Sequence, residues 1–269
     1  MLHIAATAVL TYAMHSAVIC VLAFIMVRVA RLDAASRCVV WRAALFLPLV
    51  TATFAVSIAA KESGGVTQIS VIEPMRSVMP SQFRRRNVEM IVTAIKGRPE
   101  TRTTEVDDPL SQASSLGIVL LAVSMCSVGL VTHLRRTSRI RTMLRARTPA
   151  RRVDPVVARR SIAMTESELI EIPIALRGRE ICIPGRTFQT IGDAERTSVL
   201  LHEIAHIERN DPLWMDASRA VCSMTWWQPL TRIVCERLEL DTEAAADERA
   251  VALGAPPHAL VAGLAYFAG

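Results

Sequence analysis

Three long stretches without charged residues dominate the hydrophobic pattern of the first half of the chain. They cover residues 4–27, 43–60 and 116–134, and each ends at a basic residue. An apolar helix of about 20 residues is long enough to cross the hydrocarbon core of a bilayer. We therefore predict three transmembrane helices, of which the first two form a hairpin over residues 1–60. Pro48 is a candidate kink in the second.

The second half of the chain begins with short apolar stretches that have the composition of strands. These stretches are residues 161–165, 169–174 and 180–183. We expect them to form a small sheet, and one of them to be an edge on which an extended peptide can pair by strand addition.

Helical patterns follow the predicted strands. A buried helix begins after Gly192, with Asp193 as its predicted N-cap. Asp211 and Pro212 end this helix, and Asp211 is the predicted N-cap of the next. Residues 236–251 contain neither Gly nor Pro and predict a further helix. The fold expected for residues 161–269 is therefore α+β.

Composition and charge support a membrane protein and suggest its orientation. Apolar residues make up 51% of the chain and the mean hydropathy is +0.33, which is unusual for a soluble protein. Residues 28–42 carry four arginines against one aspartate, and residues 135–160 carry ten arginines against one aspartate. Positive charge marks cytoplasmic segments. The N-terminus is thus expected outside, and residues 161–269 are expected on the cytoplasmic side of the inner membrane.

Two segments between these regions have alternative interpretations. Residues 61–115 are rich in Ser, Thr and Pro and are predicted to be a poorly ordered external loop; a small sensing element is the alternative. The basic segment 135–160 is expected to bind anionic lipid headgroups, with an acidic protein or nucleic acid as the alternative partner. Because no nucleic-acid-binding signature accompanies it, we expect no direct nucleic acid binding.

One sequence motif indicates a specific reaction, metal-assisted hydrolysis. His202, Glu203 and His206 form a His-Glu-x-x-His pattern within an apolar helical frame. Two histidines four residues apart project from one helix face and can bind a single Zn²⁺. Glu203 can then take a proton from an activated water, as the general base of a hydrolase.

A third ligand is predicted on the helix at 236–251. Glu243 and Asp247 are four residues apart, share one face, and are flanked by three alanines that allow close packing. Glu243 would complete the set of protein ligands for one zinc ion per chain, and Asp247 would orient a ligand imidazole from behind. Asp211 is a weaker candidate for the same role near His206. The nearby carboxylates Glu236, Glu239 and Glu248 are expected to be exposed charges.

Residues 167–251 resemble the BlaR/MecR-type membrane metallopeptidases, the group of gluzincins that regulates antirepression. The resemblance rests on Ile181-Cys-Ile-Pro184, the run from His202 to Asp211, Trp226-Trp-x-Pro-Leu230 and Glu243-x-x-Ala-Asp247. It implies a gluzincin-like peptidase with zinc on His202, His206 and Glu243, Glu203 as catalytic base, and a transcriptional repressor as protein substrate. Members that sense β-lactams carry a fourth span and a penicillin-binding domain. Their absence here suggests a short or truncated member, or a separate sensor protein.

Two alternatives to this function stay open. One is a quality-control peptidase like the HtpX-type gluzincins. The other is a non-catalytic signal transducer with a structural zinc, although a structural site needs no general base such as Glu203.

Several other residues carry narrower expectations. The six cysteines show no paired spacing, so a disulfide framework is not expected. His15, within the first span, is expected to be neutral and bonded to a neighbouring helix. For the tryptophans at 214, 226 and 227, core packing and anchoring at the membrane interface are equally supported. The sequence identifies no oxyanion stabiliser, and His258 is a weak candidate.

Overall fold

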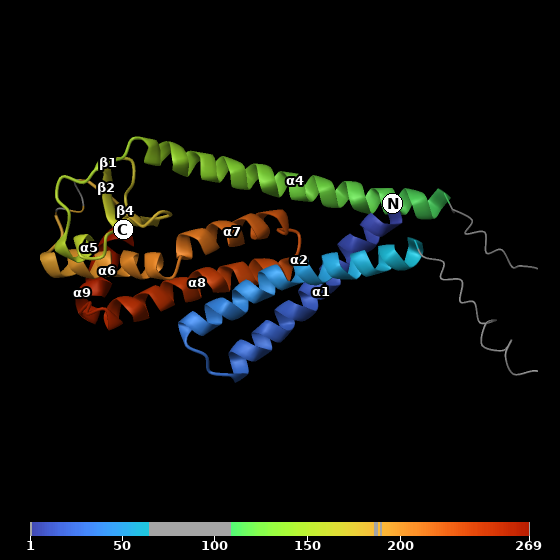
Figure 1. Ribbon diagram of the computed structural model, residues 1–269, viewed down its shortest axis with the longest axis horizontal. Helices are drawn as coiled ribbons and strands as arrows, with labels where there is room; N and C mark the ends of the chain where they lie inside the picture. Colours follow the sequence, from blue (N-terminus) through green and yellow to red (C-terminus); the bar gives the residue numbers. More distant parts are fainter. Residues whose placement is uncertain (1, 65–108, 186–187, 189, 269) are drawn as a thin grey trace, which may run out of the picture.

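The computed structural model describes residues 2–64, 109–185, 188 and 190–268 (Figure 1). Most of the segment predicted as an external loop, 61–115, lies outside these residues. Three helices are long and apolar enough to cross a membrane: α1 (Leu2–Val29), α2 (Ala34–Gly64) and α4 (Pro109–Arg145). The described residues thus contain as many helices able to cross a membrane as the sequence predicts.

The second candidate span begins earlier than its uncharged stretch, at Ala34 instead of residue 43. The helix continues through Arg37 and Arg42 because both guanidinium groups are paired, with Asp241 and Asp211 respectively. Helix α4 likewise runs past residue 134 into the basic segment, and ends at Arg145.

The small mixed sheet lies at the end of α4. It consists of β1 (Thr148–Pro149), β2 (Ala163–Ser167), β3 (Ile174–Leu176) and β4 (Glu180–Pro184) in the order β1-β2-β4-β3. Strands β2 and β4 are parallel, and the other pairs are antiparallel. The first and third predicted strands correspond to β2 and β4. The prediction of a strand at 169–174 is wrong except for its last residue, because Pro173 cannot donate to a ladder.

Helix α6 (Asp193–Glu208) covers the sheet together with the short helix α5 (Pro155–Ala158), and α9 (Pro257–Ala268) packs against α6. The core between them contains Ile181, Phe188, Leu200 and Ile204, each no more than 2% exposed. This packing fixes the face that α6 turns away from the sheet, towards α8.

Both predicted N-caps are wrong by one residue. Gly192 occupies the N-cap of α6, while Asp193 is the first helical residue and pairs with Arg196. Asn210 occupies the N-cap of α7 (Asp211–Met224), in the left-handed conformation that asparagine tolerates. The carboxylate of Asp211 is not a cap because it is bonded to side chains instead.

A helical hairpin formed by α7 and α8 (Pro229–Ala252) packs among the three candidate spans (Figure 1). Helix α7 lies against α4, and α8 lies against α2 and α1. A Cβ atom at Gly129 of α4 would overlap the carbonyl of Ser223, so only glycine permits this close approach. At the hairpin tip, Gln228 donates to the Ser16 hydroxyl of α1.

Each of the three tryptophans contacts a candidate span. Trp214 packs edge-on against Phe46, Trp226 donates to the carbonyl of Met125, and Trp227 packs against Tyr12. Trp214 and Trp226 are nevertheless 40% and 50% exposed, so both packing and anchoring at the membrane interface stay open for them. The imidazole of His15 lies 3.1 Å from the Thr51 hydroxyl on α2, which confirms a partner on a neighbouring helix.

The sequence predicts no disulfide framework, and the structure joins a single pair of cysteines, Cys222 and Cys235. Their spacing of 13 residues follows no motif. The turn between α7 and α8 brings them face to face, which only the folded hairpin reveals. The other four cysteines are free.

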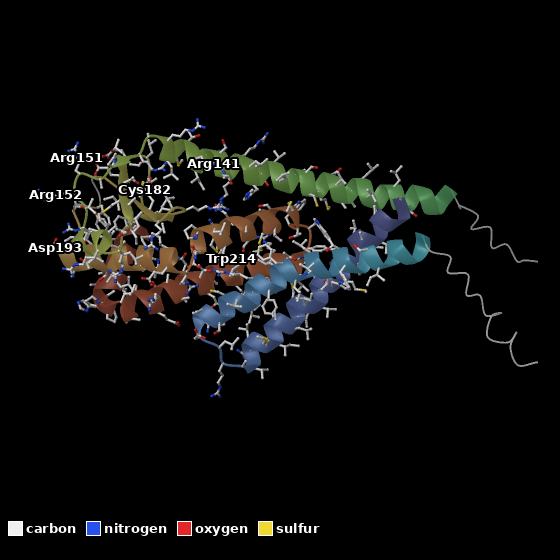
Figure 2. All side chains as sticks on the ribbon, viewed as in Figure 1. Arg141, Arg151, Arg152, Cys182, Asp193 and Trp214 are labelled. Carbon is white, nitrogen blue, oxygen red and sulfur yellow. A yellow bond between two sulfur atoms is a disulfide. The ribbon has the colours of Figure 1, made fainter. Side chains whose placement is uncertain are left out.

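Part of the basic segment pairs with the sheet. Arg147 bonds to Glu180 and Arg151 lies near Glu166, both on the sheet. Figure 2 shows Arg141, Arg151 and Arg152 projecting from the end of α4 and the β1 connection, and all three are exposed.

Candidate metal centre

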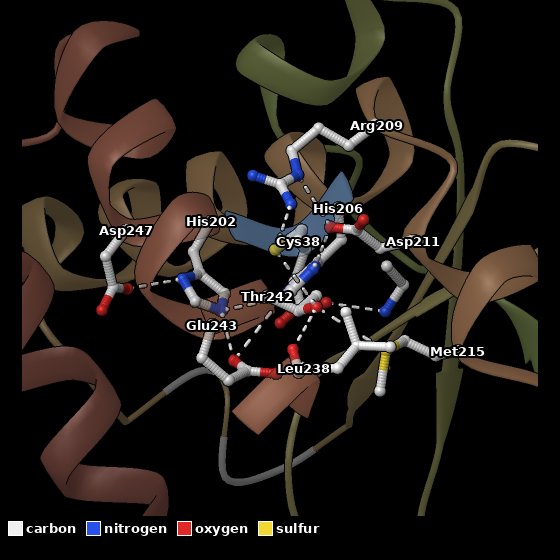
Figure 3. A network of polar contacts seen from close by, with 12 residues as sticks. Cys38, His202, His206, Arg209, Asp211, Met215, Leu238, Thr242, Glu243 and Asp247 are labelled. Atoms are coloured by element: carbon white, nitrogen blue, oxygen red, sulfur yellow. Dashed lines mark hydrogen bonds and ion pairs between the residues drawn. The ribbon is translucent and has the colours of Figure 1, made fainter. Parts of the chain in front are cut away.

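Helix α6 presents the two motif histidines on the face turned away from the sheet. The Nε2 atoms of His202 and His206 lie 3.1 Å apart, and the two rings meet edge to face (Figure 3). His202 is buried and His206 is nearly so. Their spacing of one helical turn is what makes both donor atoms point at one position.

Helix α8 brings the predicted third ligand to the same position. The Glu243 Oε2 atom lies 3.4 Å from His202 Nε2 and 3.6 Å from His206 Nε2. On α8, Ala246 and Ala250 are fully buried, and Ala250 packs in the same core cluster as α6, whereas Ala245 packs in the cluster shared with α1 and α2. The structure thus brings His202, His206 and Glu243 together as a group that could hold a metal ion.

Each histidine is bonded on its far nitrogen to a carboxylate. His202 Nδ1 lies 2.8 Å from Asp247 Oδ1, and His206 Nδ1 lies 3.0 Å from Asp211 Oδ2. When each Nδ1 carries the donated proton, each Nε2 lone pair is free to face the centre. Both carboxylates that the sequence suggested for this position therefore contact the histidines.

The surrounding carboxylates dominate the electrostatics of the metal-free centre. Burial alone would lower the pKa of His202, but Asp247 and Glu243 outweigh it and raise that pKa to about 9. Asp211 and Glu243 likewise outweigh burial at His206, whose pKa rises to about 10. The two histidines in turn hold the pKa of Glu243 well below its usual range.

Glu203 points towards the sheet side of the centre. Its Oε2 atom accepts a hydrogen bond from the backbone N–H of Ala175 on β3, at 2.6 Å. Burial raises the pKa of this carboxyl above its ordinary value, although both histidines oppose the shift. A carboxyl with this environment is suited to accept a proton near neutral pH.

The Glu243 side chain, which α8 contributes, is 63% exposed. The centre is therefore accessible to solvent on the side of this carboxylate. A cavity of about 360 Å³ lies nearby, between the β3–β4 turn and the junction of α6 and α7. Its lining includes Leu176, Arg177, Ile207 and Leu213. An extended chain along β3 would therefore pass both the metal centre and this cavity.

Sequence reasoning does not identify three residues that contact Asp211 or Glu203. Arg42 of α2 and Arg209 both donate to Asp211, and Ala175 donates to Glu203. Arg209 belongs to the motif run, but Arg42 had been interpreted only as a topology signal. His258 is exposed in the first turn of α9. As predicted, Glu236, Glu239 and Glu248 are exposed.

Comparison with protein families gives one match. The family model described as BlaR1 peptidase M56 matches residues 6–256, from the first candidate span to the connection before α9. The match includes the spans, the sheet and all three residues of the candidate metal centre. No individually curated protein matches the chain.

Proposed function

Because this chain belongs to the BlaR1 peptidase M56 family of membrane-associated metallopeptidases, we propose that it is a zinc-dependent endopeptidase acting on a cytoplasmic protein. The observation that carries the proposal is the convergence of His202, His206 and Glu243, with Glu203 beside them. A site with only a structural metal has no need of that additional carboxyl.

The donor set fits zinc in both chemistry and size. Zinc prefers imidazole and carboxylate ligands at about 2.1 Å, so two ligands of a tetrahedral ion lie about 3.4 Å apart. The three donor separations are 3.1, 3.4 and 3.6 Å. Three protein ligands leave the fourth tetrahedral position for water or substrate, as in catalytic zinc sites.

The proposed chemistry assigns Glu203 the proton transfers. A zinc ion bound at this centre would supply the Lewis acidity that activates a water and polarises the scissile carbonyl. Glu203 accepts a proton from the attacking water and returns it to the leaving amine. Asp247 and Asp211 keep the two imidazoles in the required tautomer and orientation.

The substrate is proposed to lie on β3. This strand is an edge of the sheet and contacts α6. The N–H of Ala175 points away from β4, since it reaches Glu203. In an antiparallel pair such outward groups alternate with those bonded to the partner strand, and can pair with an added peptide. A side chain of that peptide would occupy the cavity beside Leu176.

The cytoplasmic location rests on the basic segments. The turn between α1 and α2 and the end of α4 both lie towards the peptidase region, opposite the ends of α2 and α4 that face the undescribed segment (Figure 1). Both are rich in arginine, which favours the cytoplasmic side. The substrate would then be cytoplasmic, and a transcriptional repressor is the specific candidate, acting in signal transduction.

Proteomics of newly formed protein termini tests this function. Cells producing the wild-type chain are compared with cells producing Glu203→Gln, and with Glu248→Gln as the control for an exposed carboxyl. We expect a small set of cytoplasmic cleavage sites that disappears only in Glu203→Gln. Many unrelated misfolded substrates would favour the quality-control alternative. Identical termini in all three strains would overturn the proposal.

A further inference from the structure

Asp211, which lies behind His206, also connects the metal centre to a membrane span. This carboxylate is 2% exposed, and its Oδ2 atom bonds to His206 and to Arg209. Its Oδ1 atom accepts from Arg42 Nη2 at 2.8 Å. Arg42 is part of α2, within the second candidate span, and its guanidinium also lies over the Trp214 ring.

The same face of α2 makes a second connection, on the other side of the centre. Arg37 and Trp41 both donate to Asp241, at 2.8 and 2.7 Å. Cys38 lies 3.7 Å from the hydroxyl of Thr242 (Figure 3). Asp241 and Thr242 directly precede Glu243 on α8. The contacts of α2 with these two residues therefore hold the turn of helix that carries this candidate ligand.

These contacts are spaced so that one helix face makes them all. Residues 37, 38, 41 and 42 follow the i, i+1, i+4, i+5 pattern of a single face. Trp41 is 2% exposed and packs against Phe24 of α1, which fixes the rotation of α2. The face therefore cannot turn without disturbing both connections.

We propose that α2 is a positioning element of the metal centre, in which Arg42 holds Asp211 against His206 and the Arg37–Trp41 pair holds the helix turn that carries Glu243. The inference rests on the proposed function, since it assigns these histidine and glutamate side chains to a metal. A displacement of α2 in the membrane is then transmitted to two of the three ligands.

A purely structural ion pair would have different consequences. It would attach α2 to α7 and contribute to stability, but would leave the orientation of His206 unchanged. A positioning role alters the ligand geometry itself. Metal affinity and the visible spectrum of bound Co²⁺ report that geometry, and neither requires turnover.

The test uses the full chain in detergent and a Glu203→Gln background, so that no result depends on hydrolysis. Arg42→Ala should weaken Co²⁺ and Zn²⁺ binding roughly 10–100-fold, the effect typical of losing support behind a ligand, and change the Co²⁺ spectrum. Arg42→Lys should restore part of the affinity, because it keeps the charge without the planar fork. Trp41→Phe, which keeps the ring packing but loses the bond to Asp241, should give a smaller loss in the same direction. Arg28→Ala, which removes an exposed arginine of α1, should match the parent.

Wild-type affinity and spectrum in both Arg42→Ala and Trp41→Phe would overturn the proposal. If Arg42→Ala does not fold, Arg42→Lys and Trp41→Phe decide the question alone. In the active background, Arg42→Lys should lower kcat with little change in KM. Absence of hydrolysis by the wild-type chain would defeat the proposed function, while the metal-binding differences would still decide the role of α2.

Discussion

The backbone N–H of Ala175 donates to the Glu203 carboxylate at 2.6 Å, so the edge strand of the sheet is bonded directly to the proposed general base. One backbone group thus lies where a substrate strand and the reacting water would both approach. Substitutions at Ala175 test the importance of this N–H for both roles together.

Replacing Ala175 with proline removes its N–H, and Ala175→Ser retains it. The lost donor does not pair with β4, so the sheet should persist. We expect Ala175→Pro to raise KM for long peptides and lower kcat/KM at least tenfold, while Ala175→Ser stays near the wild type. Steady-state kinetics on peptides of increasing length measure this. Equal kinetics for the two variants would exclude β3 as the substrate edge.

Asp247 should support the metal through His202. Asp247→Asn replaces the carboxylate at Nδ1 with a neutral group, and a loss of roughly 10–100-fold in zinc affinity or activity is expected. Competition with a chelator measures the affinity. The neighbouring exposed Glu248 supplies the control, Glu248→Gln, which should bind zinc normally. Normal affinity in Asp247→Asn would remove Asp247 from the site.

Metal binding should release protons at neutral pH. The pKa values of His202 and His206 are raised to about 9 and about 10, so the metal-free pair holds protons at pH 7.5 that a metal must displace. We expect at least one proton released per zinc ion and an affinity that rises with pH until about 10. Calorimetry in two buffers of different ionisation enthalpy measures the release, and its absence would contradict the raised pKa values.

The buried carboxyl of Glu203 should destabilise the metal-free fold at neutral pH. Burial raises its pKa, so its contribution to stability is fully present below the ordinary pKa of glutamate and is lost as pH rises through the raised value. Metal-free Glu203→Gln should therefore unfold at a higher temperature than the wild type at pH 7.5, with the difference vanishing near pH 4. A variant less stable than the wild type at pH 7.5 would contradict this assignment.

The convergence of His202, His206 and Glu243 follows from the sequence because local spacing rules apply to these residues. His202 and His206 are one helical turn apart, and the alanines around Glu243 indicated close helix packing. Local rules also predicted the three spans, whose uncharged stretches are long.

The features that sequence did not reveal depend on distant parts of the chain. Arg42 directly precedes the uncharged stretch 43–60, so it suggests a span boundary, whereas in the structure its charge is paired with Asp211 inside a continuing helix. The Cys222–Cys235 bond depends on the α7–α8 turn. Asp211 is a residue type that often caps helices, but its carboxylate is bonded to the side chains of Arg42, His206 and Arg209 instead.

Turnover of a defined peptide by the purified full chain, stripped of metal and then supplied with one equivalent of Zn²⁺, tests the central claim most directly. The wild type should gain activity with zinc. Glu203→Gln should bind the same amount of zinc and hydrolyse the peptide roughly 10²–10⁴-fold more slowly, the contribution usual for a positioned general base. Equal turnover by the two proteins, or wild-type turnover that does not depend on zinc, would contradict the account.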